Sequence, residues 1–303
     1  MTPGPDDQPD PNQTALAAAA RQRFVSLARG HEEKIDLAEA ALVIAAEEFP
    51  GLDVPAYLAR LDDMAGRVRR LARTQTIGPE APSGETGGGG SAENPDELAL
   101  AALHHVLFEQ EGFEGDQIDA DYQPFYHPRN SYLNDVLDRK RGMPITLSLL
   151  YCEVARRAGL EAVGIALPGH FMAEFRGASF RALVDPYNRG NRLRPEDRAQ
   201  LPQDLIIPAS KKQILARMLN NLKEAYRLRG PLPKALAAVE RLLVIAPTVD
   251  QVRDRGLILA RMNLPGPAWF DLKLYARLAP GAPDAQHTSD AADKLWKDMG
   301  RLN

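Results

Sequence analysis

Cysteine is nearly absent from this sequence, because Cys152 is the only one among 303 residues. A single cysteine excludes an intrachain disulfide and any zinc or iron–sulfur site built from several cysteines. The histidines do not supply a metal site either, because they lack the spacing of a ligand set. His104 and His105 are adjacent, and three others stand alone: His31, His127 and His287. We therefore expect no metal and no other cofactor.

Long apolar runs and an excess of positive charge are also missing. No run of about 18 apolar residues could span a bilayer. A formal net charge of −4 argues against nucleic-acid binding, which normally needs a basic face. The N-terminal stretch MTPGPDDQPDPNQ is acidic and proline-rich, and it lacks the apolar core of a signal peptide. These absences predict a soluble, cytoplasmic protein that binds neither membranes nor nucleic acid.

Hydrophobic residues make up 44% of the chain, enough for one large domain and a smaller one. Residues 1–12 have too few apolar side chains to offset the entropy of ordering, so we expect a disordered tail. We expect a main domain over residues 13–208 and a helical region over residues 209–303. A stretch rich in Gly, Ser and Pro predicts a flexible loop over residues 77–95.

Helical periodicity dominates the first part of the chain and predicts helices over residues 35–50, 53–72 and 95–110. Ser131 is expected to cap a further helix, which Gly142 would end. The basic residues 139–141 fall in the last turn of that helix, where cations complement the helix dipole. A phosphate-binding or partner-binding patch is the alternative interpretation of these three residues.

The stretch from Pro144 to Gly159 predicts a central helix with a clean apolar stripe and a neighbouring row of small residues. Cys152 belongs to that row and lies about 12 Å along the axis from Pro144, at 1.5 Å per residue. A reactive cysteine is favoured at a helix N-terminus, where the dipole stabilises the thiolate. We therefore expect Cys152 to be a packing residue.

Two stretches rich in strand formers, EAVGIALPGHFMAEF and ASFRALVDPY, predict a β-hairpin turning at Gly177 and Ala178. A two-residue loop would pair Ala173 with Ala182 and Glu174 with Arg181, which gives one wholly apolar face and an opposite-charge pair on the other. The same register places His170 directly across from Asp185. A carboxylate there would orient the imidazole, either as part of a site or as a structural hydrogen bond.

The C-terminal part contains two similar segments, KALAAVERLLVIAP and PAWFDLKLYARLAP. Ala246-Pro247 recurs thirty-three residues later as Ala279-Pro280, and Ala235 recurs as Ala268. A period near 34 residues is typical of helix–turn–helix repeats of the tetratricopeptide type. So short an array would need support from the main domain.

Four stretches resemble the Sir-B-type bacterial proteins of the transglutaminase-like superfamily: NSYLNDVLDRKRGMPITLSLLYCEVARRAGL, LPGHF, DPYNRG and RMLNNLKEAY. The resemblance runs from about Ile35 to the C-terminus, outside the glycine-rich loop, and RDRGLIL fits the family's tetratricopeptide-like region. It implies an α+β fold. In that fold a helix packs on a small antiparallel sheet in a papain-like core flanked by helices, and an all-α region follows.

The resemblance also implies positions for the family's three catalytic groups. In active transglutaminase-like enzymes, the nucleophilic cysteine lies two residues after a glycine at the helix start. Counted from Gly142, that position is Pro144 in this sequence, while His170 and Asp185 match the family's histidine and aspartate. The nucleophile is therefore expected to be absent. The remaining candidates are for ligand binding: Ser148, Asn130 and Asn188.

Three functions are compatible with this pattern. The leading hypothesis is a non-catalytic module that binds another protein. A related core occurs in F-box proteins, which act in protein recognition. The second is an amidase-like or peptidase-like hydrolase that uses His170 as the base and Ser148 as the nucleophile, which needs a Ser–His hydrogen bond. The third is transglutamination through Cys152. The sequence identifies neither the partner nor the oligomeric state.

Overall fold

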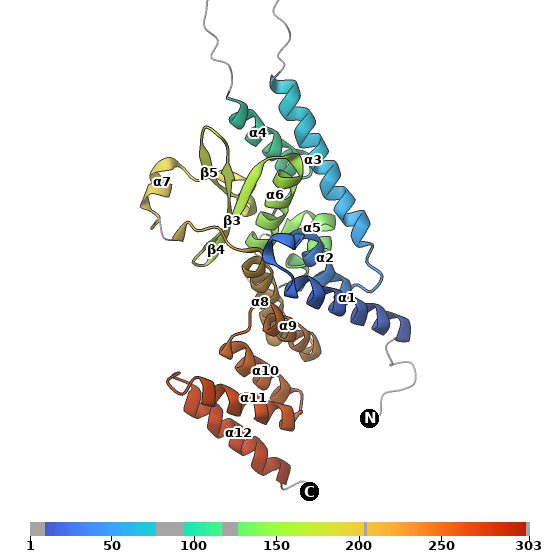
Figure 1. Ribbon diagram of the computed structural model, residues 1–303, viewed down its shortest axis with the longest axis vertical. Helices are drawn as coiled ribbons and strands as arrows, with labels where there is room; N and C mark the ends of the chain where they lie inside the picture. Colours follow the sequence, from blue (N-terminus) through green and yellow to red (C-terminus); the bar gives the residue numbers. More distant parts are fainter. Residues whose placement is uncertain (1–9, 77–93, 117–126, 203–204, 301–303) are drawn as a thin grey trace, which may run out of the picture. The chain divides into compact units, whose positions relative to one another are not determined.

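The computed structural model describes residues 10–76, 94–116, 127–202 and 205–300 (Figure 1). Most of the expected tail and loop lies outside these ranges, at residues 1–9 and 77–93. Pro11 and Asn12, the end of the expected tail, begin helix α1 (Pro11–Arg29). At the end of the expected loop, the Asn94 side chain caps helix α4 (Pro95–His104), and Pro95 is its first residue.

The chain divides into two compact units. The described part of the first consists of residues 10–21, 36–76, 94–116, 129–202 and 205–210, and that of the second of residues 22–35, 127–128 and 211–300. The sequence placed all of residues 13–35 in the main domain, whereas the structure groups residues 22–35 with the C-terminal helices. No helix in the described ranges is long and apolar enough to cross a membrane.

The first unit has the expected α+β fold. Its helices are α2 (Leu37–Glu48), α3 (Val54–Thr76), α4, a π-helical segment (His105–Gln110), α5 (Leu133–Arg139), α6 (Pro144–Ala158) and α7 (Pro195–Gln200). Within the described residues, four antiparallel strands form a sheet in the order β3 (Glu161–Leu167), β4 (His170–Arg176), β5 (Arg181–Asp185) and β6 (Asn191–Arg192). A separate parallel pair consists of β1 (Glu114–Gly115) and β2 (Arg141–Gly142).

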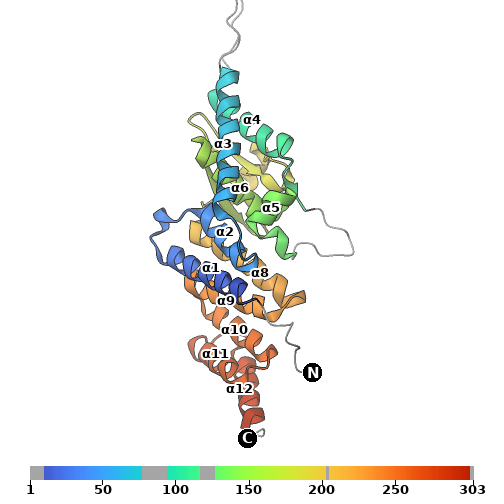
Figure 2. The ribbon, with the colours of Figure 1, turned by 90° about the vertical axis from the view of Figure 1, so that its right-hand side faces the viewer.

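Helix α6 lies at the centre of this unit, against β3 and β4 and against α3 (Figures 1 and 2). Pro144 is its first residue, where the missing N–H costs nothing. Gly159 ends it with a φ of 84°, a left-handed conformation that glycine adopts without strain. Three members of the predicted row of small residues are buried, as expected for close packing of the helix: Ser148, Cys152 and Ala155. The fourth, Gly159, is exposed at the end of the helix.

The face of the sheet opposite α6 also carries a small core, formed by Ile165, Met172 and Leu183. Side chains from the segment after β6 pack against it: Leu193, Leu201 and Ile206. Glu174 is buried and forms ion pairs with Arg176 and Arg198, both at 2.8 Å. The predicted pairing of Glu174 with Arg181 is therefore wrong, because Glu174 stands opposite Leu183 in the ladder.

The register of the β4–β5 hairpin is shifted by two residues from the predicted one. Ala173 pairs with Val184 and Phe175 with Ala182. The Gly177 N–H donates to the Phe180 carbonyl, so the hairpin turns at Ala178 and Ser179 and not at Gly177 and Ala178. A shift of two residues keeps every side chain on its predicted face, because side chains alternate with a period of two. The faces were predicted correctly and the pairs were not.

The predicted boundaries of α5 are also wrong. Tyr132, not Ser131, occupies the N-cap position, and the Ser131 hydroxyl instead donates to the Met143 sulfur at 3.2 Å. The helix ends at Arg139, because Lys140 turns left-handed with a φ of 62°. Gly142 belongs to strand β2 and therefore does not end the helix.

The second unit is helical, and it contains α8 (Lys211–Arg229), α9 (Leu232–Ile245), α10 (Val249–Arg261), α11 (Pro265–Leu278) and α12 (Ala285–Gly300). Successive helices pack on one another from α8 to α12 (Figure 2). The sequence repeat is structural, since α9 and α11 end at the equivalent residues Ala246 and Ala279. Each of these two residues donates its N–H four residues back, to Leu242 and Tyr275 respectively.

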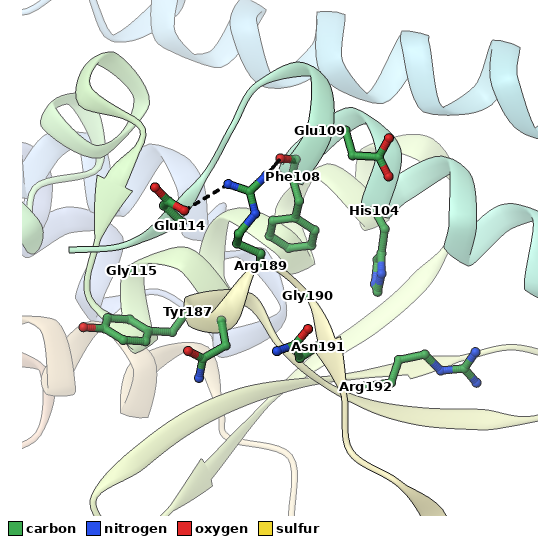
Figure 3. A pocket seen from close by; sticks show the side chains of 11 residues that line it. His104, Phe108, Glu109, Glu114, Gly115, Tyr187, Arg189, Gly190, Asn191 and Arg192 are labelled. Carbon is green, nitrogen blue, oxygen red and sulfur yellow. Dashed lines mark hydrogen bonds and ion pairs between the residues drawn. The ribbon is translucent and has the colours of Figure 1, made fainter. Parts of the chain in front are cut away.

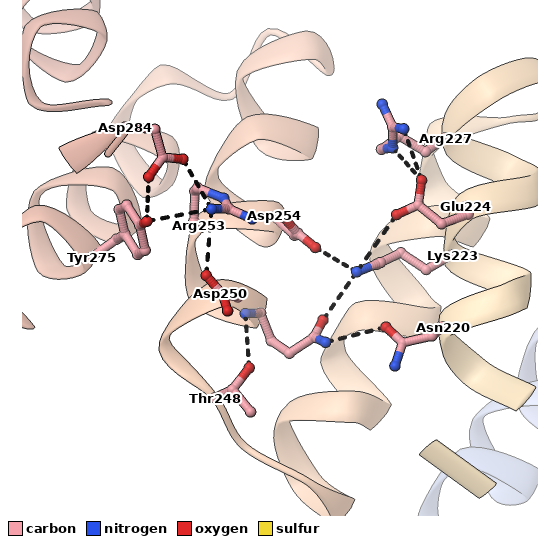
Figure 4. Close-up of polar contacts among 11 residues, drawn as sticks. Asn220, Lys223, Glu224, Arg227, Thr248, Asp250, Arg253, Asp254, Tyr275 and Asp284 are labelled. Carbon is pink, nitrogen blue, oxygen red and sulfur yellow. Dashed lines mark hydrogen bonds and ion pairs between the residues drawn. The ribbon is translucent and has the colours of Figure 1, made fainter. Parts of the chain in front are cut away.

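A polar network crosses the interior of this unit (Figure 4). Lys223 of α8 is nearly fully buried, and it forms an ion pair with Asp254 of α10 and a 3.3 Å hydrogen bond with Gln251. Arg253 continues the network to Asp284 at 2.9 Å. Buried charges of this kind need partners to offset desolvation, and the pairing they require fixes which helices meet.

Candidate functional site

His170 and Asp185 form the centre of the candidate site. His170 is the first residue of β4 and Asp185 the last of β5, and the imidazole Nε2 lies 2.9 Å from the carboxylate Oδ2. The predicted contact is present although the register differs. In the observed ladder the two residues are diagonal neighbours on one face, a separation that long side chains can bridge.

The carboxylate of Asp185 also holds the turn that follows it. Its Oδ1 accepts hydrogen bonds from the backbone N–H groups of Tyr187 (3.0 Å) and Asn188 (3.4 Å), and its Oδ2 accepts one from Asn188 Nδ2 (2.7 Å). Burial works to raise the pKa of Asp185, but the hydrogen bonds from His170 and Asn188 outweigh it, so the pKa is lowered. Asp185 is therefore ionised near neutral pH and orients the His170 ring.

The structure does not give His170 a nucleophile among the described residues. Pro144 is buried at the start of α6 and carries no nucleophilic atom. The hydroxyl of Ser148 is fully buried and donates to the Phe171 carbonyl at 3.3 Å. Cys152 is buried, and burial raises the pKa of its thiol well above the usual range. In the described part of the chain, Asp185 is the group that hydrogen-bonds to the imidazole of His170.

Asn130, a candidate for ligand binding, is occupied within the protein. Its Nδ2 donates to Asp116 at 2.7 Å, and its Oδ1 accepts from Arg139 at 2.9 Å. The neighbouring basic residues are also paired, Lys140 with Glu111 and Arg141 with Glu114. Arg139 lies in the last turn of α5, as predicted, whereas Lys140 and Arg141 follow the end of the helix. All three form ion pairs with carboxylates of residues 111–116.

A cavity of about 640 Å³ is drawn in Figure 3. It is next to the His–Asp pair, because its lining includes Tyr187 and Asn188, whose backbone N–H groups donate to Asp185. One wall comes from the end of α4, the π-helical segment and β1, and the other from the turn after β5 and from β6. The lining residues are His104, Phe108, Glu109, Glu114, Gly115, Tyr187, Asn188, Arg189, Gly190, Asn191 and Arg192. Of these, only Asn188 was a candidate from the sequence.

Two glycines allow the walls of this cavity to meet aromatic rings. A Cβ on Gly190 would lie 2.2 Å from the Phe108 ring, and a Cβ on Gly115 would lie 2.5 Å from the Tyr187 ring. Arg189 fastens the walls together, because its guanidinium binds the Phe108 carbonyl (2.8 Å) and the Glu114 carboxylate (2.9 Å). The cavity is therefore formed by specific packing and hydrogen bonds between its two walls.

His104 lines this cavity and was dismissed from the sequence as one of two adjacent histidines. Its Nε2 lies 3.2 Å from the hydroxyl of buried Tyr151. Burial, with a smaller contribution from the charge of Arg192, lowers the pKa of His104 to about 4. The signal in the sequence was its position four residues after the buried Leu100, on the inner side of the helix.

His104 should make the protein less stable as the pH falls. Its pKa is about 6.5 in the unfolded chain and about 4 in the folded one, so the unfolded state binds the proton more tightly. The stabilisation is complete above pH 6.5 and is lost as the pH falls towards 4, by about 3 kcal/mol. Urea unfolding at a series of pH values should show that His104→Gln removes this loss. His105→Gln, at the exposed neighbour, serves as the control and should retain it. An identical loss in His104→Gln and wild type would contradict the assignment.

Comparisons with known proteins agree with the architecture. A model of the transglutaminase-like superfamily matches residues 55–220, and a tetratricopeptide repeat model matches residues 222–292. A UPF0162 protein from Xylella fastidiosa is 30% identical over 270 residues, which cover 84% of this chain and 88% of that protein. A UPF0162 protein from Pseudomonas aeruginosa is 27% identical over 277 residues, covering 87% and 88%. Human F-box only protein 21 is 30% identical over 144 residues, 43% of this chain and 22% of that protein.

Proposed function

Since the chain belongs to the transglutaminase-like superfamily, we propose that it is a non-catalytic member, which binds a segment of another protein in the cavity beside His170 and Asp185. The observation that carries this proposal is the His–Asp pair, which has no nucleophile beside it in the part of the chain that the structure describes. Covalent catalysis needs a thiol or hydroxyl within hydrogen-bond reach of the base. Pro144 stands at the position where the family's cysteine is expected.

The hydrolase alternative receives no support from the position of Ser148. Its hydroxyl is fully buried and bonds to a backbone carbonyl, whereas the reaction would need it to donate to His170. Transglutamination through Cys152 is equally unsupported, because the thiol is buried and its pKa is raised. His170 and Asp185 then serve to hold the cavity wall, through the hydrogen bond that Asn188 Nδ2 donates to Asp185.

The hydrogen-bonding groups left available in the cavity are neutral. Arg189 pairs with Glu114, Arg192 with Glu97, and Glu109 with His105, so the charged groups largely satisfy one another. Two side-chain groups remain. One is the amide of Asn191, which has no hydrogen bond among the described residues, and the other is the side-chain oxygen Oδ1 of Asn188. Amide donors and acceptors beside the Phe108 and Tyr187 rings suit the backbone and apolar side chains of a peptide segment.

The helical second unit supports the same role. Stacked helical repeats present extended surfaces that commonly bind other proteins, and residues 222–292 match a tetratricopeptide repeat. A transglutaminase-like unit with a peptide-binding cavity, joined to such repeats, has two surfaces for protein recognition. We propose that the biological partner is a protein, in keeping with the expectation from the sequence.

Quantitative affinity purification tests this proposal. The tagged full-length chain, expressed at its native level, should retain at least one protein reproducibly. His170→Ala and Asn191→Ala should reduce its recovery at least about tenfold, which corresponds to about 1.4 kcal/mol of binding energy. Gln286→Ala removes an exposed amide on α12, which does not line the cavity, and should leave the recovery unchanged. Recovery of no specific protein, or equal recovery with both cavity variants, would refute the proposal.

A further inference from the structure

The two copies of the repeat bury the same side of helices α9 and α11. Residues thirty-three positions apart are equally buried where the helices face their neighbours, as in Ala235 and Ala268 or Val239 and Leu272. Helix α11 packs between α10 and α12, and α9 packs against α8 and α10. The inner faces of the two helices therefore correspond position by position.

Their outer faces differ in exposure. Ile245 near the end of α9 is 7% exposed, whereas its equivalent Leu278 on α11 is 55% exposed. Arg241 is 5% exposed, whereas its equivalent Leu274 is only partly buried. The outer face of α11 is thus both the more apolar and the more exposed of the two.

On α9, Arg241 lies against the aromatic ring of Phe24, from the part of α1 that belongs to the second unit. The Arg241 guanidinium lies 5.9 Å from the centroid of that ring, and Phe24 is fully buried. In the first copy of the repeat, helix α1 therefore places an aromatic ring against Arg241. Leu274 is the equivalent residue in the second copy.

On α11, the uncovered side chains form a continuous stripe. Phe270, Leu274 and Leu278 follow one another at intervals of four residues, on one side of the helix, and Phe270 is 59% exposed. Arg277 lies beside this stripe, is exposed, and forms no ion pair within the described part of the chain. Trp269 packs on Trp296 of α12 at its edge, with ring centroids 5.0 Å apart.

We propose that the stripe of α11 binds an amphipathic helix of a partner protein, which inserts an aromatic side chain over Leu274 as Phe24 does over Arg241. The equivalence of the two copies supplies the geometry of the contact. Because Arg277 is an exposed positive charge, the partner helix should carry a carboxylate about one turn from its aromatic residue. The inference rests on the proposed role in protein binding and assigns it a second surface, separate from the cavity.

A peptide taken from this chain serves as the probe. It has the sequence of residues 16–30 with Arg21→Glu, which places a carboxylate one turn before Phe24. The protein contains only two tryptophans, Trp269 and Trp296, and the peptide contains none, so tryptophan fluorescence reports on the stripe. Titration of the full-length protein should give a saturable change with half-saturation near about 100 μM, as expected for a short isolated helix.

Matched variants locate the contact. Phe270→Asp and Leu274→Asp should weaken binding at least about tenfold, and so should Phe24→Ala in the peptide. Leu228→Asp changes a similarly exposed leucine at the end of α8 and should leave binding unchanged. Because these substitutions lie on exposed or partly exposed positions, circular dichroism should show that the fold is retained.

Three results would overturn the inference. One is the absence of saturation up to about 1 mM peptide, and another is equal binding by Phe270→Asp and wild type. The third is a concentration-dependent dimer in sedimentation that Phe270→Asp dissolves, because a second copy would then be the occupant. None of these variants alters the cavity, so retained binding in the affinity purification would show that the proposed function stands without this surface.

Discussion

Cys152 in the native protein is expected to react with a disulfide reagent at pH 7.5 at least about 1,000-fold more slowly than in the unfolded chain. The thiolate is the reactive form, and each unit by which a thiol pKa rises removes about nine-tenths of it near neutral pH. Burial, and secondarily the charge of Glu153, raises the pKa of this thiol. The reagent must also reach a side chain that lies within α6. Reaction therefore requires the helix to open.

The measurement compares the rate at which the disulfide reagent releases its coloured thiolate in buffer with the rate in guanidinium. The result is simple to interpret because the chain has one thiol. Gln286→Cys adds a second thiol at an exposed position of α12, and this thiol should react rapidly while Cys152 remains silent. A native rate for Cys152 within tenfold of the unfolded rate would contradict the assignment of this residue to packing. It would also reopen transglutamination as a function.

Gly190→Ala is expected to destabilise the protein by about 2–4 kcal/mol. The backbone at Gly190 has a φ of +76°, which costs an alanine about 1 kcal/mol. The added Cβ would also lie 2.2 Å from the buried ring of Phe108. That ring cannot move freely, because it is buried and packs against His104 and Tyr151, with ring centroids 5.4 and 6.3 Å apart. Overpacking of this severity adds roughly 1–3 kcal/mol.

Gly112→Ala is the matched control for this prediction. Its φ of +74° imposes the same backbone strain, but a Cβ there would meet no atom within 4 Å. Urea unfolding should therefore show a loss of about 1 kcal/mol for Gly112→Ala and a clearly larger loss for Gly190→Ala. Equal losses would mean that the cavity wall at Phe108 yields, and that the cavity is less rigid than described.

The sequence predicts the architecture well where a local pattern decides it. The helix that begins at Pro144 follows from proline at the first position and an apolar stripe. The repeat follows from the recurrence of Ala246-Pro247 as Ala279-Pro280, and both alanines end a helix. The fold class and the family follow from the motifs around His170 and Asp185.

The hairpin register could not be predicted from the strands, because two registers place every side chain on the same face. A distant segment selects between them. Asp96, in the first turn of α4, accepts hydrogen bonds from the backbone N–H (2.6 Å) and the hydroxyl (2.5 Å) of Ser179. Asn94 also binds this hydroxyl. The α4 helix thus fixes a hairpin loop that lies more than 80 residues away, a contact that strand periodicity cannot reveal.

The cavity was missed for a similar reason. Its walls come from residues 104–115 and 187–192, and neither segment contains a motif that indicates a pocket by itself. Their approach depends on Gly190 meeting Phe108 and Gly115 meeting Tyr187. These glycines were visible in the sequence, but the rings that they admit belong to the opposite wall.

The most direct test of the account is a search for any covalent or hydrolytic chemistry at the His170–Asp185 pair. Purified protein is incubated with a glutamine-containing peptide and a biotinylated amine, and intact mass spectrometry follows both peptide and protein. We predict that the peptide is neither hydrolysed nor coupled to the amine, and that the protein gains no adduct at Ser148 or Cys152. Turnover that is abolished by His170→Ala would contradict the claim that this member of the superfamily is non-catalytic.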